Sequence, residues 1–123
     1  MRATYEQNPA DNTEALHLVD ATGNTLSIIR ALHQESADDP DARRYALAQD
    51  TGATVYGGID LWLVDDDDHG WIYLSPEAEV VLDADGDAYE VELPADEFDL
   101  VDRTLRRFLA LDGGEVVDER RSR

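Results

Sequence analysis

Residues 88–111 read AYEVELPADEFDLVDRTLRRFLAL and contain a strand pattern followed directly by a helix pattern. Tyr89, Val91 and Leu93 alternate with acidic residues, which is typical of a strand with one buried and one solvated face. Pro94 then ends the strand, because proline has no amide hydrogen to give to a sheet ladder. The stretch therefore predicts a strand and a helix that follow one another in a single small domain.

The helix is expected from about Asp96 to Leu111. Its apolar side chains are spaced three, four and three residues apart and form one stripe, made by Phe98, Val101, Leu105 and Phe108. Acidic residues fill its first turns and arginines its later ones, an order that suits the helix dipole. Asp99–Arg103 and Asp102–Arg106 are i,i+4 pairs that stabilise such a helix, and Gly113-Gly114 ends it.

Apolar runs upstream of residue 88 are separated by turn-forming residues and predict β-hairpins. Leu61–Val64 and Trp71–Leu74 flank an acidic tip, Tyr45–Leu47 and Thr54–Tyr56 flank a turn at 50–52, and Glu79–Leu82 is expected to pair with 88–93. Gly57-Gly58 predicts a bulge or bend in a sheet. The predicted fold class is α+β, an antiparallel β-meander of hairpins packed against the C-terminal amphipathic helix.

The first third of the chain fits two interpretations. Leu16–Val19 and Leu26–Ile29 flank a turn and fit a hairpin, whereas Leu26, Ile29 and Leu32 also have helical spacing. We favour a strand and turn whose second arm continues as a helix near Ala31, followed by an acidic loop over residues 35–42. The expected division is a polar, turn-like N-terminal segment (1–13), one α+β domain (14–112) and a loose, charged C-terminal tail (113–123).

The composition is strongly acidic. The 123 residues carry 29 acidic and 10 basic side chains, so the formal net charge is −19; all ten basic residues are arginine, and aspartate outnumbers glutamate 19 to 10. Self-repulsion of this size destabilises a small compact domain in dilute buffer, whereas at 1 M salt the Debye length falls to about 3 Å. In composition the chain resembles small acidic proteins of halophilic archaea and of their viruses. This implies a salt-rich cytoplasm or a virion, and loosely bound K⁺ and Na⁺.

Composition also excludes several classes of protein. Hydrophobic residues make up 42% of the chain, enough for one core. There is no cysteine, so a disulfide framework and a thiolate metal site are excluded. No apolar run approaches the ~20 residues of a membrane span, and we expect no membrane partner.

Two acidic segments invite a metal prediction that their spacing does not support. Asp83-x-Asp85-Gly86-Asp87 departs from a calcium loop, because glycine falls at the fourth position and Pro94 at the twelfth. Asp65–Asp68 with His69 would need a second segment to converge on one ion, so a solvated hairpin tip is the preferred interpretation. No resident metal and no cofactor are predicted.

Catalysis is the least favoured of three functional hypotheses. Histidine is the side chain suited to acid–base work near neutral pH, and His17, His33 and His69 are each a possible partner for Ser27, Ser36 or Ser75. No Gly-x-Ser-x-Gly elbow accompanies them, so a small histidine-dependent enzyme has no motif behind it, and no catalytic residue is assigned.

A second hypothesis comes from residues 14–60. Residues 15–20 and 26–33 resemble the opening helices of ArsR-like winged-helix regulators of haloarchaea, and residues 47–53 followed by 54–56 are similar to their second helix, turn and recognition helix. The resemblance implies a DNA-binding transcription regulator. The recognition helix it implies contains Gly57-Gly58 and no arginine, although such a helix needs donors aimed at DNA.

The favoured hypothesis is a non-catalytic structural or protein-interaction module, a subunit of an assembly with a protein partner or with copies of itself. Adjacent residues of a strand point to opposite faces, so the hairpin around residues 61–74 places large apolar groups on both faces. Aromatic and arginine side chains commonly anchor interfaces. The candidate interaction residues are Tyr56, Trp62, Trp71, Tyr73, Arg103, Arg106, Arg107, Arg120, Arg121 and Arg123.

Overall fold

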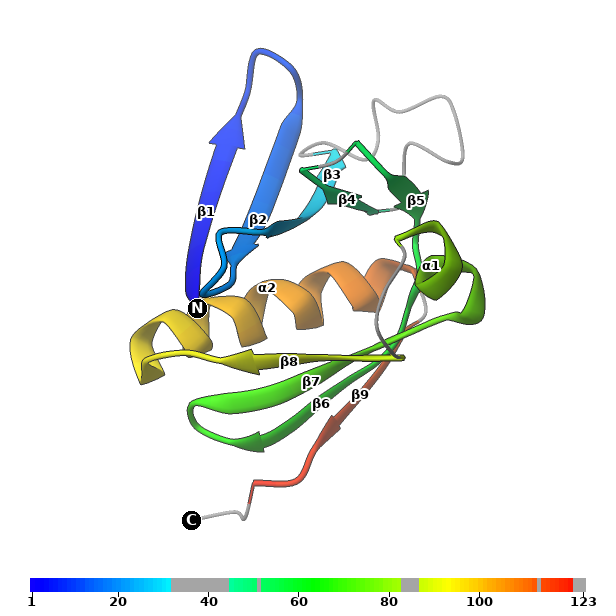
Figure 1. The fold of residues 1–123 in the computed structure, drawn as a ribbon. Coiled ribbons are helices and arrows are strands. Elements are labelled where there is room, and N and C mark those ends of the chain that lie inside the picture. Colours follow the sequence, from blue (N-terminus) through cyan, green and yellow to red (C-terminus); the bar gives the residue numbers. More distant parts are fainter. Residues whose placement is uncertain (32–44, 51, 83–86, 113, 121–123) are drawn as a thin grey trace.

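The computed structural model describes residues 1–31, 45–50, 52–82, 87–112 and 114–120 as two sheets with a long helix between them (Figure 1). The five-stranded sheet has the order β1-β2-β3-β4-β5, with β1 Arg2–Asn8, β2 Thr13–Val19, β3 Thr25–Ala31, β4 Ala46–Gln49 and β5 Thr54–Tyr56. The four-stranded sheet has the order β8-β7-β6-β9, with β6 Ile59–Asp66, β7 His69–Leu74, β8 Ala88–Glu92 and β9 Glu115–Asp118. Helices α1 Pro76–Val81 and α2 Ala95–Asp112 complete the α+β fold, which confirms the predicted class and the long helix.

The described part of the N-terminal third adopts the hairpin, one of its two predicted structures. β2 and β3 pair antiparallel, and Leu16, Leu18, Leu26 and Ile28 alternate into the core. The Asp20 side chain accepts hydrogen bonds from the Thr22 and Asn24 amides and organises the turn between the strands. Ala31 is the last residue of β3, and the expected helix beyond it and the acidic loop over 35–42 lie outside the described residues.

Gly57 and Gly58 carry the chain from the first sheet to the second. Their φ angles are +71° and +101°, a region that side-chain-bearing residues rarely adopt. A Cβ at Gly58 would also lie 2.9 Å from the Cβ of Ala78 in α1. The predicted bend is confirmed, and it marks the boundary between the two sheets.

The β6–β7 hairpin is confirmed as predicted, and its inner face builds the core around α2. Trp62 is fully buried, with its ring centroid 5.7 Å from that of Phe98 on α2. A Cβ on Gly70 would lie 2.8 Å from the Trp62 ring and 2.7 Å from the Leu63 carbonyl oxygen. Glycine at this position therefore lets the indole pack directly on the backbone of β7.

The predicted strand at Glu79–Leu82 is wrong. Residues 76–81 form helix α1 because Ser75 caps it, accepting a hydrogen bond from the Ala78 amide at 3.1 Å, and Pro76 occupies its first turn. Val80 and Val81 lie on the exposed side of this helix. Strand β8 instead pairs with β7 along its length.

Both chain ends were expected outside the domain, whereas residues 2–8 and 115–118 form strands of its two sheets. Residues 2–8 form β1, which pairs with the whole of β2 and buries Ala3. Residues 115–118 form β9, which runs parallel to β6 and supplies an edge of the four-stranded sheet. Neither segment has the long apolar alternation that marks a strand in sequence. Each forms a strand because it pairs with β2 or β6 in the folded domain, not because of local propensity.

The described part of residues 14–60 consists of strands. A winged-helix regulator needs helices over 15–20 and 47–53, where the chain forms β2 and the β4–β5 region. Hydrophobic alternation in these segments has a period of two, and the paired strands satisfy it. The structure therefore provides no recognition helix in these segments.

Candidate functional site

The face of the four-stranded sheet opposite α2 carries a continuous set of apolar side chains. Register places Leu61 beside Tyr73, and Leu63 between Trp71 and Val117, all on this face. Each of these five is only half-buried, and none of the described elements lies on this side of the sheet in Figure 1. We call Leu61, Leu63, Trp71, Tyr73 and Val117 the outer face.

Sequence reasoning placed four aromatic residues together as interaction candidates, and the structure separates them. Trp71 and Tyr73 lie on the outer face, half-buried. Trp62 lies on the opposite side of its strand and is fully buried, so its prediction as an interaction residue is wrong. Tyr56 is 56% exposed but belongs to β5 of the other sheet.

Two of the predicted partner-binding arginines are used within the molecule. Asp102 of α2 is buried, and its Oδ1 accepts hydrogen bonds from Trp62 Nε1 at 2.9 Å and Arg106 Nε at 2.7 Å. Arg106 and Arg120 both reach Asp118 of β9 at 2.7 Å. These hydrogen bonds, from Arg120 above all, hold the pKa of Asp118 below its usual range. This cluster ties β9 to α2, and both arginines already pair with carboxylates of the chain.

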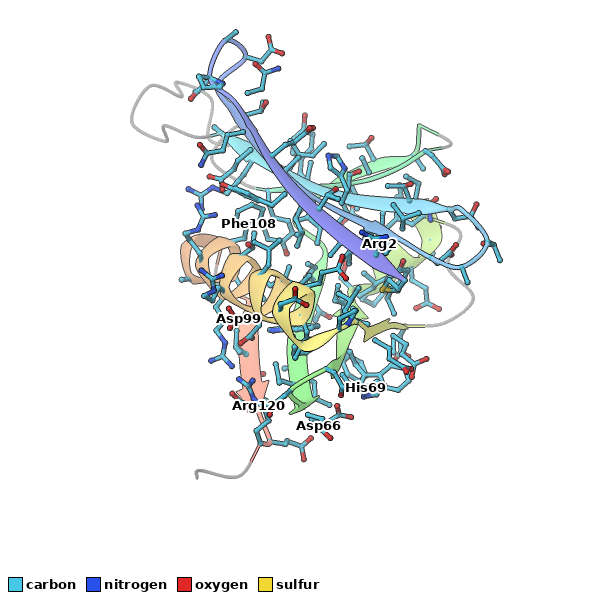
Figure 2. All side chains as sticks on the ribbon, turned by 90° about the vertical axis from the view of Figure 1, so that its left-hand side faces the viewer. Arg2, Asp66, His69, Asp99, Phe108 and Arg120 are labelled. Carbon is cyan, nitrogen blue, oxygen red and sulfur yellow. The ribbon has the colours of Figure 1, made fainter. Side chains whose placement is uncertain are left out.

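A third arginine, Arg107, follows Arg106 in α2 but pairs with the five-stranded sheet. Its guanidinium lies 2.6 Å from Glu14, a carboxylate that is only 2% exposed. Buried Arg30 lies 3.6 Å from the same carboxylate and over the ring of Phe108, which Figure 2 shows on the side of α2 that faces the five-stranded sheet. Since Glu14 lies between two cations, this cluster fastens the five-stranded sheet to the helix.

The remaining arginine candidates either pair within their own helix or lie outside the described residues. Arg103 is exposed and forms the predicted i,i+4 pair with Asp99 at 2.8 Å, just as Arg106 forms the predicted pair with Asp102. Arg121 and Arg123 lie outside the described residues. With 29 acidic residues in the chain, most arginines find an internal carboxylate, and clustering in sequence is therefore a poor guide to an exposed basic patch.

One corner of the outer face carries charged groups. His69 Nδ1 lies 2.7 Å from an Asp65 carboxylate oxygen, and its Nε2 lies 2.7 Å from Glu90. These two carboxylates, Glu90 first, raise the pKa of the imidazole above its usual value. Its ring also packs edge-on against Trp71, with centroids 5.4 Å apart. Figure 2 shows His69 at the end of the sheet where Asp66 and Arg120 also lie.

A second histidine cluster lies on the five-stranded sheet. His17 Nδ1 lies 2.7 Å from Ser27 Oγ, and its Nε2 lies 3.1 Å from Glu6, so a serine, an imidazole and a carboxylate form a chain across three strands. Acyl transfer also needs amide donors aimed at an oxyanion. Ser27 is in the middle of β3, which is paired on both sides, so the ladder uses the amides around it. The arrangement therefore lacks the amide donors that would stabilise an oxyanion. The third histidine, His33, lies outside the described residues.

No protein-family model, no curated protein and no solved structure matches the chain. Among the described residues, neither helix combines the length and the apolar character that crossing a bilayer requires. The conclusions about function therefore depend on the geometry above.

Proposed function

We propose that the chain is a non-catalytic, salt-adapted interaction module that associates with further copies of itself through the outer face. The single observation that carries the proposal is the set of five half-buried apolar side chains on a sheet face that no described element covers. A contiguous apolar patch of this kind is typical of an interface rather than of a solvated surface. Trp71 is one of the five, and tryptophan is among the residues that most often dominate binding energy.

The net charge indicates where such an association would operate. Two copies that each carry −19 repel strongly in dilute buffer, and this repulsion is screened at molar salt. We therefore propose a salt-rich setting, the cytoplasm of a halophilic archaeon or the virion of its virus. Raising KCl from 0.1 M to 2 M is expected to raise the melting temperature, and a melting temperature independent of salt would contradict salt adaptation.

The native mass in 2 M KCl, measured by size exclusion with light scattering, tests the association. The wild type is expected to elute as an oligomer, and Trp71→Asp as a folded monomer with an unchanged far-ultraviolet circular dichroism spectrum. Tyr56→Asp is the matched control, because it places the same charge at an exposed aromatic position on the other sheet. A monomeric wild type at every salt concentration, or dissociation by Tyr56→Asp alone, would reject the outer face as the interface.

A further inference from the structure

We propose that His69, Glu90 and Glu92 form a binding site for a divalent transition cation such as Zn²⁺, an inference independent of the association proposed above. One potential ligand atom from each of the three lies within 4.8 Å of the other two. Register explains the convergence, because His69 lies directly opposite Glu92 across the β7–β8 pair and Glu90 follows two residues away on the same face. The acidic hairpin tip needs a second segment of the chain to bind one ion, and strand β8 supplies that segment.

Asp65 fixes the orientation of the imidazole. Its two carboxylate oxygens lie 2.7 and 2.9 Å from His69 Nδ1, so the Nδ1–H group donates its hydrogen bond to Asp65. This contact orients the ring with Nε2 toward Glu90. Metal-bound histidines commonly donate their other ring hydrogen to a carboxylate in this way. The register shift between Val64 and Asp66 makes Asp65 the extra residue of a β-bulge, a device that re-aims a side chain. Asp65 is thus a positioning residue for a ligand on Nε2.

The charge balance of the corner favours a divalent cation. Three carboxylates, Asp65, Glu90 and Glu92, surround one imidazole, so even a protonated His69 leaves two negative charges in excess. Within the described part of the chain, the Glu92 carboxylate receives no hydrogen bond and forms no ion pair, although it offers a ligand atom within 4.8 Å of the other two groups. A cation on Nε2 that also contacts Glu90 and Glu92 would neutralise this excess.

The donor set points to the class of metal. One imidazole and two carboxylates suit Zn²⁺ and its first-row neighbours, whereas Ca²⁺ and Mg²⁺ prefer oxygen ligands alone. Ligands at about 2.0–2.2 Å from a tetrahedral ion lie about 3.4 Å from one another. Side-chain rotations of exposed Glu90 and Glu92 span the difference from the present spacing. Three protein ligands leave the fourth position of a tetrahedral ion open.

Trp71 provides the readout, because its ring lies 5.4 Å from the imidazole. Paramagnetic Co²⁺ added to the full chain in 2 M KCl at pH 7.5 is expected to quench tryptophan emission saturably at one equivalent. Diamagnetic Zn²⁺ should reverse the quenching, and calorimetry should give the same stoichiometry. Absence of saturable quenching and of calorimetric heat would overturn the proposal.

Variants separate a site from general attraction of cations to an acidic surface. His69→Gln and Glu92→Gln are each expected to weaken Co²⁺ binding at least tenfold, and Asp65→Asn by about 10- to 100-fold. His17→Gln is the matched control, because among the described residues His17 is a second imidazole in contact with a carboxylate, Glu6, and the variant should bind as the wild type does. Equal affinity of wild type, His69→Gln and Glu92→Gln would assign the binding to surface charge and reject the site. Circular dichroism of each metal-free variant checks that the fold is intact.

Discussion

The faces of the two sheets that point away from α2 have different chemistry, although both belong to antiparallel hairpins of similar size. Across the five-stranded sheet, a row of paired residues reads Thr4, His17, Ser27, Ala48 and Thr54. Across the four-stranded sheet, the corresponding row reads Val117, Leu63, Trp71 and Glu90. Polar and small residues fill the first row, and large apolar residues fill most of the second.

The inner sides of the two sheets are attached to α2 in the same way. A buried carboxylate makes the attachment in each case: Glu14 of β2 pairs with Arg107 of α2, and Asp102 of α2 accepts a hydrogen bond from Trp62 Nε1 of β6. Since the five-stranded sheet folds against α2 with a polar row on its far side, the fold itself does not require apolar residues there. This contrast favours a role other than folding for the apolar side chains of the outer face.

The largest effect is expected at the inner attachment of the five-stranded sheet. Glu14→Ala removes the carboxylate next to Arg30, whose guanidinium is buried and whose Nη1 has no hydrogen-bond partner among the described residues. An uncompensated buried charge of this kind costs about 3–5 kcal/mol. Urea unfolding in 2 M KCl measures the loss, and Glu6→Ala, at an exposed carboxylate, is the control expected to stay within about 0.5 kcal/mol. A loss below 1 kcal/mol for Glu14→Ala would show that the attachment contributes little.

A smaller effect is expected at the attachment of the four-stranded sheet. Asp102→Asn keeps an oxygen that can accept the Trp62 Nε1 hydrogen, and Arg106 retains Asp118 at 2.7 Å. The loss of one charge-assisted pair is expected to reduce the free energy of unfolding by about 1–3 kcal/mol. The same urea titration measures it, followed by the emission of Trp62. A loss as large as that of Glu14→Ala would make the two attachments equivalent.

The smallest effect is expected on the outer face itself. Leu63→Thr, made in the Trp71→Asp background to exclude association, is expected to change the free energy of unfolding by less than about 1 kcal/mol, because Leu63 is half-exposed in the single chain. Val64→Thr is the matched control one residue along the same strand. Its side chain is fully buried, so an added hydroxyl there costs about 1–3 kcal/mol. Equal losses at the two positions would show that the outer face is part of the folding core.

Much of the fold could be predicted, because local patterns decide it. The stripe from Phe98 to Phe108 specifies α2, and alternation specifies β6, β7 and β8. The helix at 76–81 was missed because Val80, Val81 and Leu82 suggest a strand, although Ser75-Pro76 is a helix-start signal present in the sequence. Strand β9 has only four residues, and its partner β6 lies about 50 residues upstream, so no local pattern indicates the pairing.

The candidate site could be predicted only in part. Alternation indicates that Leu61 and Trp62 point to opposite faces, but it does not indicate which face meets the core. The i,i+4 arginine pairs on α2 were predicted, whereas the pairing of Arg107 with Glu14 joins residues that are far apart in sequence. The ligands Glu90 and Glu92 were seen only as the solvated side of a strand, since the register of β8 against β7 brings them to His69.

The position of α2 between the sheets has a consequence for how the domain opens. Phe98 packs on Trp62 of one sheet, and Phe108 lies under Arg30 of the other, so a single helix fills the interior of both. Neither sheet can expose its inward-facing side chains to water while the helix remains in place. Backbone amide hydrogens of β2 and β6 should therefore exchange with deuterium at one common slow rate, through a single cooperative opening of the domain.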